Sequence, residues 1–260
     1  MLVDGYDAGL VAREGLLAHG RGEAFDYILD EKTQEFARDA IRAASAAILL
    51  AEHPVISVNG NVAALCPEEL RKLARESDAA LEVNLFYDSD VRRQKIARIM
   101  RSYSGGILGV DPAFRKRLGG SLDSARATVD SRGILKADLV VVPLEDGDRT
   151  GALKAAGKTV IAFDLNPLSR TARDADITIV DNVVRAVVLL ADSCRSLAAS
   201  DRAKLEKILA QYDNDVVLSS AIRHMEQNLR RQARAMHDMM PHALTSMKDG
   251  RRNQGEANLA

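Results

Sequence analysis

The sequence is poor in aromatic side chains: tryptophan is absent, and aromatic residues make up only 4% of the 260 positions. A surface that stacks the bases of single-stranded nucleic acid depends on aromatic rings, so this composition argues against such a surface. Neither sign of charge is in excess, because 36 Lys and Arg stand against 37 Asp and Glu, a formal net charge of −1. Without an overall positive field, we expect neither nucleic acid nor a membrane as a partner.

Cysteine is equally scarce. Cys66 and Cys194 are the only two and form no CxxC pair. They cannot build a disulfide scaffold, which is typical of a protein from a reducing compartment. No run approaches the roughly 18 consecutive apolar residues of a membrane-spanning helix. Residues 1–7 show neither the basic nor the apolar part of a signal peptide. These features together predict a cytoplasmic location.

Several catalytic signatures are also missing. The five histidines show no HExxH motif and no paired spacing with cysteine, so a zinc site is not indicated. There is no GxSxG motif of a serine hydrolase. The phosphate-binding motif GxxxxGK[ST] does not occur, which excludes a P-loop.

The chain contains short β-branched runs that alternate with longer amphipathic stretches. The runs predict strands at 55–58, 81–85, 107–110, 138–143, 159–163 and 177–180. The amphipathic stretches predict helices at 34–51, 67–75, 90–102, 150–156 and 183–197. This alternation is typical of βαβ units, so we predict an α/β fold with a mostly parallel sheet flanked by helices.

Three regions depart from the alternation. Residues 1–33 predict a helical lead-in with a glycine-bearing loop, and residues 111–136 predict a loop or an excursion from the sheet. From about residue 200 the chain is helical and increasingly polar. Methionines gather there, at positions typical of helix packing or a subunit contact: Met225, Met236, Met239, Met240 and Met247. We therefore predict one domain over 1–200, a C-terminal helical extension over 201–245 and a disordered tail over 246–260.

Polar clusters follow four of the predicted strands. They are Asn59-Gly60-Asn61, the run 145–149, Asp164-Leu165-Asn166, and Asp181-Asn182. In a parallel sheet the carboxyl ends of the strands line one edge, where ligands bind. An alternative stays open at each cluster, because Asn, Asp and Gly also form turns and helix N-caps. Four clusters on one edge favour a ligand crevice.

The cluster that begins at Asp164 is the most specific one. An acid at a strand end accepts hydrogen bonds from ribose hydroxyls. Arg170 offers a planar pair of donors that matches a phosphate, and the Thr171 hydroxyl adds another donor. The spacing therefore predicts a nucleotide contact.

A second specific segment is His19-Gly20-Arg21-Gly22-Glu23. Glycines on both sides of Arg21 would let the backbone approach an anion, which the guanidinium would clamp. The segment is not a dinucleotide fingerprint, because Phe25 stands where the third glycine of GxGxxG belongs.

The acidic segment after residue 144 allows two interpretations. Asp146 and Asp148, with Glu145, could hold Mg²⁺ beside a nucleotide, since Mg²⁺ prefers oxygen ligands. Alternatively, the segment is an acidic turn whose charge Arg149 offsets.

Six motifs resemble those of the archaeal 4-phosphopantoate–β-alanine ligases, also called phosphopantothenate synthetases. The motifs are GLLAHGRGEAFDY (15–27), HPVISVNGN (53–61), EVNLFY (82–87), VPLEDGDRT (142–150), DLNPLSRTAR (164–173) and ITIVDN (177–182). Their length and fixed order make the resemblance specific, and it covers roughly residues 10–190.

The resemblance implies a Rossmann-like α/β homodimer with ligase activity in coenzyme A biosynthesis. Such an enzyme joins (R)-4-phosphopantoate to β-alanine with ATP, and gives 4′-phosphopantothenate, AMP and diphosphate through an acyl-adenylate. The ATP contacts that it implies are Arg21, Asp164, Leu165, Asn166, Arg170, Thr171, Asp181 and Asn182.

For the other roles in this reaction we form hypotheses. Arg149 would anchor the 4-phosphate of the substrate, and Asn59 and Asn61 would also contact the substrate. His19 or Glu23 would relay the proton of the β-alanine ammonium.

Two other functions remain open at this stage. A dehydrogenase or reductase could use the same sheet edge for NAD(P), although the glycine fingerprint is missing. A non-catalytic module could bind the nucleotide without turning it over.

Overall fold

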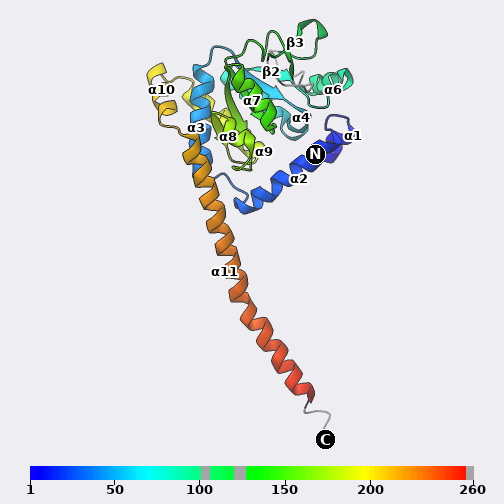
Figure 1. Cartoon of the computed structure of the whole chain (residues 1–260), viewed down its shortest axis with the longest axis vertical. Helices are drawn as coiled ribbons and strands as arrows, with labels where there is room; N and C mark the ends of the chain where they lie inside the picture. The colour runs from blue at the N-terminus through cyan, green and yellow to red at the C-terminus, as the bar shows by residue number, and fades with distance from the viewer. Residues whose placement is uncertain (101–105, 120–126, 256–260) are drawn as a thin grey trace.

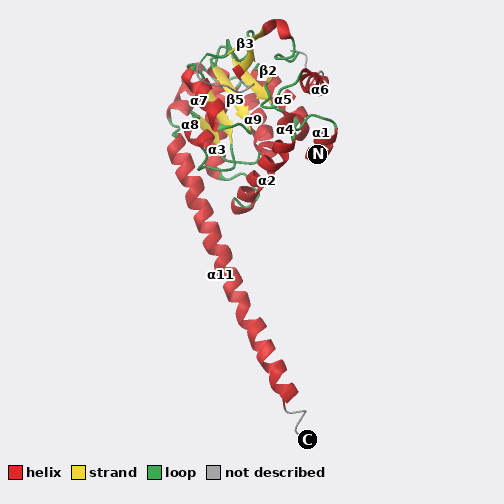
Figure 2. Cartoon of the chain, turned by 45° about the vertical axis from the view of Figure 1, so that its right-hand side comes forward, coloured by secondary structure: helices red, strands yellow, loops and turns green. Residues whose placement is uncertain are grey.

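The computed structural model describes residues 1–100, 106–119 and 127–255, with side chains up to residue 237. Its centre is a sheet of five parallel strands in the order β2-β1-β5-β6-β7. The strands are β1 (Pro54–Val58), β2 (Ala80–Val83), β5 (Leu139–Pro143), β6 (Thr159–Phe163) and β7 (Ile177–Ile179). Figure 2 shows these strands enclosed by helices. The predicted α/β fold with a parallel sheet is confirmed.

Both faces of the sheet are buried, which explains why the strands are apolar at consecutive positions. In β5, Leu139 and Val141 belong to the larger core cluster, whereas Val140 and Val142 belong to a second cluster on the other face. Helices α3 (Glu35–Leu50), α5 (Pro67–Ser77) and α9 (Val183–Leu197) contribute to the larger cluster. Helix α7 (Gly147–Ala155) covers the second face through Leu153.

Shorter elements complete this body. They are α4 (Gly60–Leu65), α6 (Asp90–Met100), η1 (Pro112–Phe114), β3 (Arg115–Arg117), β4 (Thr128–Asp130) and α8 (Arg170–Asp174). Strands β3 and β4 pair antiparallel, outside the main sheet. The segment expected at 111–136 is therefore an excursion from the sheet.

The strand expected at 107–110 is wrong. Only Leu108 bridges to Glu82 of β2, as an isolated pair. Gly106 and Gly109, on either side of that bridge, have positive φ angles of +73° and +81°, which end extended pairing on both sides. The helix expected at 90–102 ends at Met100, and the positions after it lie outside the described residues.

The glycine-bearing loop expected within residues 1–33 lies at Gly9, which has a φ of +73°, whereas the glycines of the His19–Glu23 segment are helical. After α1 (Leu2–Asp7), a single helix, α2 (Arg13–Ile28), runs through the whole His19–Glu23 segment. A glycine inside a helix costs about 1 kcal/mol relative to alanine, but this helix of sixteen residues contains several good helix formers and tolerates three glycines, Gly15, Gly20 and Gly22.

Helices α10 (Arg202–Ala210) and α11 (Asn214–Gly255) form the C-terminal part, and α11 extends away from the body (Figure 1). Its first turns pack on the body through Val217, Leu218, Ala221 and Met225, whereas Met236 is exposed. The side chains of Met239, Met240 and Met247 lie outside the described ones. The tail predicted over 246–260 overlaps the end of α11, and its last five residues lie outside the described part of the chain. The proposed domain division stays a prediction. None of the helices among the described residues is long and apolar enough to cross a membrane.

Candidate functional site at the carboxyl edge of the sheet

The four predicted polar clusters lie together at one edge of the sheet. The strands that precede them are all parallel, so their carboxyl ends point the same way. The Asn59 amide after β1 donates to the carbonyl oxygens of Pro143 and Leu144 after β5, at 2.8 and 3.2 Å. Chain order reverses between these two strands, and such a switch point is where ligands bind in open α/β sheets.

Helix α2 crosses this edge from β1 to β7. At the β1 end, the Asn61 amide donates to the Gly15 carbonyl oxygen, at 2.9 Å. Midway, a Cβ built on Gly22 would lie 3.9 Å from the Leu165 side chain, which follows β6. At the β7 end, Asp26 accepts a hydrogen bond from the Asn182 amide, at 3.0 Å. The segment predicted to bind an anion therefore faces the strand ends, as part of a helix.

Asp164 and Arg21 come close in space although 143 positions separate them in the sequence. Burial raises the pKa of the Asp164 carboxyl, while hydrogen bonds from Ser169 and the Asn166 amide and the positive charge of Arg21 act against that rise. The backbone N–H of Asn166 donates to Asp164 Oδ1 at 2.9 Å. Leu165 is nearly buried beneath α2. Two segments that the sequence predicts separately thus lie next to each other.

Arg170 lies at the surface of the same site. Its Nη1 donates to Asp148 Oδ1 at 2.8 Å, and both side chains are about two-thirds exposed. A Cβ on Gly147 would stand 2.6 Å from Arg170 Cβ, so the arginine stem passes over a position that suits only glycine. Thr171 is buried, and its hydroxyl donates to the Glu145 carbonyl oxygen at 3.1 Å. The Thr171 side chain therefore orders the loop after β5.

Asp181 and Asn182 belong to a network that ties α2 to α9. Arg185 donates to Asp181 Oδ1 at 2.7 Å and to Asp26 Oδ1 at 2.6 Å. The Thr33 hydroxyl donates to the other oxygen of Asp181 at 2.6 Å. Burial works against the charge of Arg185, but its hydrogen bonds to the two carboxylates outweigh burial and raise its pKa. Sequence reasoning missed Asp26, Thr33 and Arg185; the only signal was the i,i+4 spacing of Asp181 and Arg185.

The capping alternative is confirmed at several strand ends. The side chains of Asn59, Asp146 and Asn182 each accept a hydrogen bond from the first turn of the helix that follows. Asn59 is nearly buried, and its amide group is already engaged with the loop after β5. These side chains fix the first turns of the helices that follow the strands.

The residues assigned to catalysis lie on α2, and those assigned to metal binding lie at the start of α7. His19 Nε2 lies 3.4 Å from Glu23 Oε1, one turn further along α2. Among the described residues, no group of three His, Cys, Asp or Glu side chains is arranged to hold a metal ion. Asp146 caps α7 and Asp148 pairs with Arg170.

Arg149 lies inside the body, with none of its surface exposed. Its charge lowers the pKa of Glu82, a fully buried carboxyl in β2 that sequence reasoning missed. Burial dominates at Glu82 and raises its pKa to about 7, against hydrogen bonds from the Ile134 and Asp130 amides. The role of Arg149 as a phosphate anchor stays a prediction.

Comparison with known proteins gives one consistent result. A family model described as phosphopantothenate/pantothenate synthetase matches residues 36–228. A 4-phosphopantoate–β-alanine ligase of Thermococcus kodakarensis is 52% identical over 234 residues, which cover 89% of this chain and 88% of that protein. A ligase of the same name from Thermococcus onnurineus is 51% identical over the same shares. One from Methanosarcina mazei is 45% identical over 230 residues, 88% of this chain and 89% of its own.

Proposed function

The chain belongs to the phosphopantothenate/pantothenate synthetase family, and we propose that it condenses 4-phosphopantoate with β-alanine to give 4′-phosphopantothenate in coenzyme A biosynthesis. The observation that carries this proposal is 52% identity, over nearly the full length, to a relative named for that ligase activity. The motifs of the resemblance also meet at one edge of the sheet, which is the arrangement that a binding crevice requires.

ATP would lie over the ends of β6 and β7, under α2. Arg21 and the exposed Arg170 are the cations that approach this region, and Asp164 would accept from the ribose. Leu165 and Asn166 would line the nucleotide from the same loop. Thr171, Asp181 and Asn182 already bond to protein groups, so they would hold this half of the crevice in shape and reach ATP mainly through their backbone.

The reaction would proceed in two balanced steps. A carboxylate oxygen of 4-phosphopantoate attacks the α-phosphorus of ATP; the bond from that phosphorus to the bridging oxygen breaks, and diphosphate leaves. The neutral amine of β-alanine then attacks the acyl carbon of the adenylate, and AMP leaves with the electrons of the broken C–O bond. Neither step needs a protein nucleophile, but both need positive charge beside the phosphates, which Arg21 and Arg170 would supply.

The proton of the β-alanine ammonium needs an acceptor before the amine can attack. His19 and Glu23 form a pair on α2, and His19 is mostly shielded from solvent. Imidazole is the side chain best matched to proton transfer near neutral pH, so we assign this relay to the pair.

Mg²⁺ would enter as a complex with the phosphates of ATP. The described residues do not form a magnesium site by themselves. Asp146 caps a helix, and Asp148 is exposed and pairs with Arg170, so the two carboxylates do not converge on one ion. Mg²⁺ commonly keeps its waters and uses substrate phosphates together with one or two carboxylates. We assign no chemical step to the ion.

We also propose that the chain acts as a cytoplasmic homodimer. The projecting α11, with exposed Leu229 and Met236, offers a surface for a second copy. Both cysteines are buried and free, which fits a reducing compartment.

The test follows AMP and 4′-phosphopantothenate by mass in a mixture of enzyme, ATP, 4-phosphopantoate and β-alanine. We expect both products only when all substrates are present, and neither when unphosphorylated pantoate replaces the phosphorylated acid. Tight ATP binding without turnover would instead favour the non-catalytic module, and saturable binding of NADPH would favour the oxidoreductase.

The role of Arg21 is tested separately. Arg21→Ala should raise the KM for ATP, while Arg13→Ala, at the start of the same helix, should leave it unchanged. Full activity of the Arg21 variant at limiting ATP would refute that role.

A further inference from the structure

Helix α2, which carries Arg21, is only lightly packed against the body. Of its sixteen residues, all of which the structure describes, only Asp26 is buried. The contacts at the two ends of this helix therefore decide where Arg21 lies relative to the strand ends. A displacement of about 1 Å at a group that positions a substrate can lower the rate about 100-fold, so these contacts bear directly on the site.

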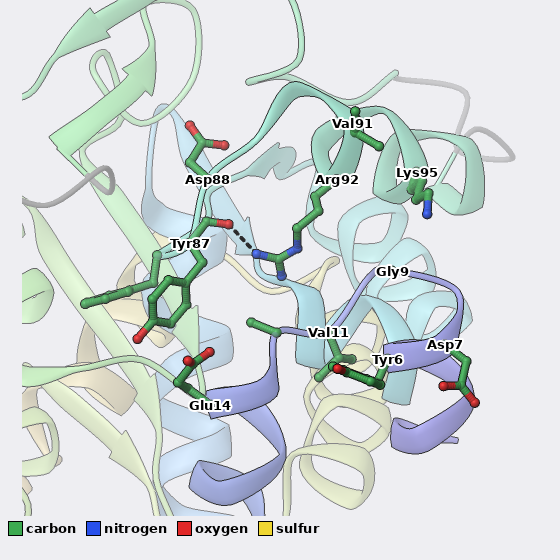
Figure 3. Close-up of a pocket in the computed structure, with 12 residues that line it drawn as sticks. Tyr6, Asp7, Gly9, Val11, Glu14, Tyr87, Asp88, Val91, Arg92 and Lys95 are labelled. Atoms are coloured by element: carbon green, nitrogen blue, oxygen red, sulfur yellow. Dashed lines mark hydrogen bonds between the residues drawn. The ribbon is translucent and has the colours of Figure 1, made fainter.

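The beginning of α2 is attached to the β1 side of the site. Arg92 of α6 donates to the carbonyl oxygens of Leu10 and Tyr87, the former at 2.6 Å, and so joins the chain that leads into α2 to the loop after β2. Figure 3 shows the Arg92 guanidinium in the space between Tyr87 and the N-terminal segment. The side-chain amide of Asn61 holds the first turn of α2 through the Gly15 carbonyl oxygen, at 2.9 Å.

The other end of α2 is held by the first part of α11, which passes beside it (Figure 1). The side-chain amide of Asn228 donates to the carbonyl oxygen of Ile28, the last residue of α2, at 2.8 Å. Arg231 donates to Asn228 Oδ1 at 2.7 Å and to Asp30 Oδ1 at 2.6 Å. His224 Nε2 lies 3.3 Å from the other oxygen of Asp30. We refer to Asn228, Arg231 and Asp30 as the α11 clasp.

The turn that follows α2 has an unfavourable backbone conformation. Asp30 and Glu31 have φ angles of +65° and +53°, in the left-handed region that favours glycine. Residues in such a conformation persist only where the surrounding structure fixes them. The hydrogen bonds of Asn228 and Arg231 to this turn are contacts of that kind, so the clasp sets the direction in which the chain leaves α2.

An apolar cluster beside the clasp continues to the nucleotide half of the site. It contains Leu29, directly after α2, and Leu165, in the loop after β6 that is implied to contact ATP. Its members from α11 are Leu218, Ala221 and Met225. Helix α11 therefore packs against both the end of α2 and the nucleotide loop.

We propose that the first part of α11 positions α2 for ATP, with Asn228 and Arg231 as positioning residues. This role rests on the proposed function, because it requires that Arg21 contacts ATP. Both residues act through the end of α2 and not on ATP itself. Since the beginning of the helix stays attached, loss of the contact at Ile28 lets the helix tilt. Arg21, midway between Gly15 and Ile28, moves with it.

The test measures the dissociation constant of ATP by titration calorimetry in the absence of the other substrates, so that the readout does not depend on turnover. Asn228→Leu keeps the side-chain volume and removes both hydrogen bonds, and it should raise the dissociation constant about tenfold. Arg231→Met should raise it about threefold, because this side chain is 62% exposed. Arg231→Lys should restore most of the affinity. The matched control is Arg230→Met, which breaks a pair with Glu226 within α11 and should bind ATP as the wild type does.

A second readout separates positioning from a general loss of stability. Hydrogen–deuterium exchange should become faster over residues 13–28 in Asn228→Leu, while α9 keeps its wild-type protection. Asp30→Gly is the complementary variant, since glycine suits the left-handed backbone at this position. It should keep the wild-type Tm, yet it lacks the carboxylate and should weaken ATP binding as Arg231→Met does.

The outcomes separate this inference from the ligase proposal. If Asn228→Leu and Asp30→Gly bind ATP as the wild type does, the inference is overturned even when product forms. It is also overturned if Arg230→Met weakens binding equally, if α9 loses protection together with α2, or if the wild type binds no ATP. If ATP affinity depends on the clasp but the wild type forms no 4′-phosphopantothenate, the positioning role stands and the ligase proposal fails.

Discussion

Replacement of Arg185 by methionine should destabilise the protein, because the arginine links two buried acids from distant parts of the chain. The Asp181 side chain is 1% exposed and that of Asp26 is 10% exposed. Removing the cation leaves both carboxylates buried without a positive partner. Breaking a buried ion pair in this way costs about 3–5 kcal/mol. Hydrogen bonds from Thr33 and Asn182 remain, so we expect the lower end of that range.

For a chain of this size, about 3 kcal/mol lowers Tm by roughly 6–12 °C. The assay is thermal unfolding at neutral pH, with Arg202→Met as the matched control. Arg202 pairs with Glu206 on one helix face, with side chains 75% and 54% exposed, and such a pair contributes about 0.5 kcal/mol or less. Equal Tm values for the two variants would refute the network as the attachment of α2 to the β7 end of the crevice.

Three further predictions concern stability and nucleotide binding. Burial raises the pKa of Glu82 from 4.5 to about 7. The folded state therefore keeps a proton that the unfolded state releases, and the free energy of unfolding should fall by about 3 kcal/mol as pH rises through that window; denaturant unfolding should show this slope in the wild type and lose it in Glu82→Gln. Gly60→Ala should lower Tm strongly, because its Cβ would collide with the Leu10 carbonyl oxygen, whereas Gly20→Ala, with no atom within 4 Å, should raise stability by about 1 kcal/mol in the same assay. Asp164→Asn should raise the KM for ATP about tenfold with little change in the KM for β-alanine, and equal effects on both would argue against its ribose role.

The parallel sheet was predictable because its strands are buried on both faces. Consecutive apolar residues such as those of β5 leave little choice of environment, and the intervening amphipathic helices set the direction of each strand. The prediction failed at 107–110, where the local residues favour a strand but Gly106 and Gly109 turn the backbone away. The sequence analysis did not place a helix through Gly20 and Gly22, where the surrounding helix formers outweigh the cost of the glycines.

The meeting of the polar clusters at one edge of the sheet was predictable for a topological reason. Parallel strands bring their carboxyl ends to one edge, so polar residues after separate strands must meet there. Contacts between distant segments carry no local signal, and the pairing of Asp26 with Arg185 spans 159 positions. The burial of Arg149 was equally unpredictable from the sequence. An arginine beside three acids is typical of a surface segment, and only the fold places it near Glu82.

The central claim is that the crevice activates a carboxylate with ATP. The most direct measurement uses 4-phosphopantoate labelled with ¹⁸O in its carboxylate, together with ATP and β-alanine. The mass of the nucleotide product is then determined by mass spectrometry. An acyl-adenylate predicts AMP that carries one labelled oxygen, alongside 4′-phosphopantothenate. Unlabelled AMP, or ADP with the label in inorganic phosphate, would contradict the proposed activation.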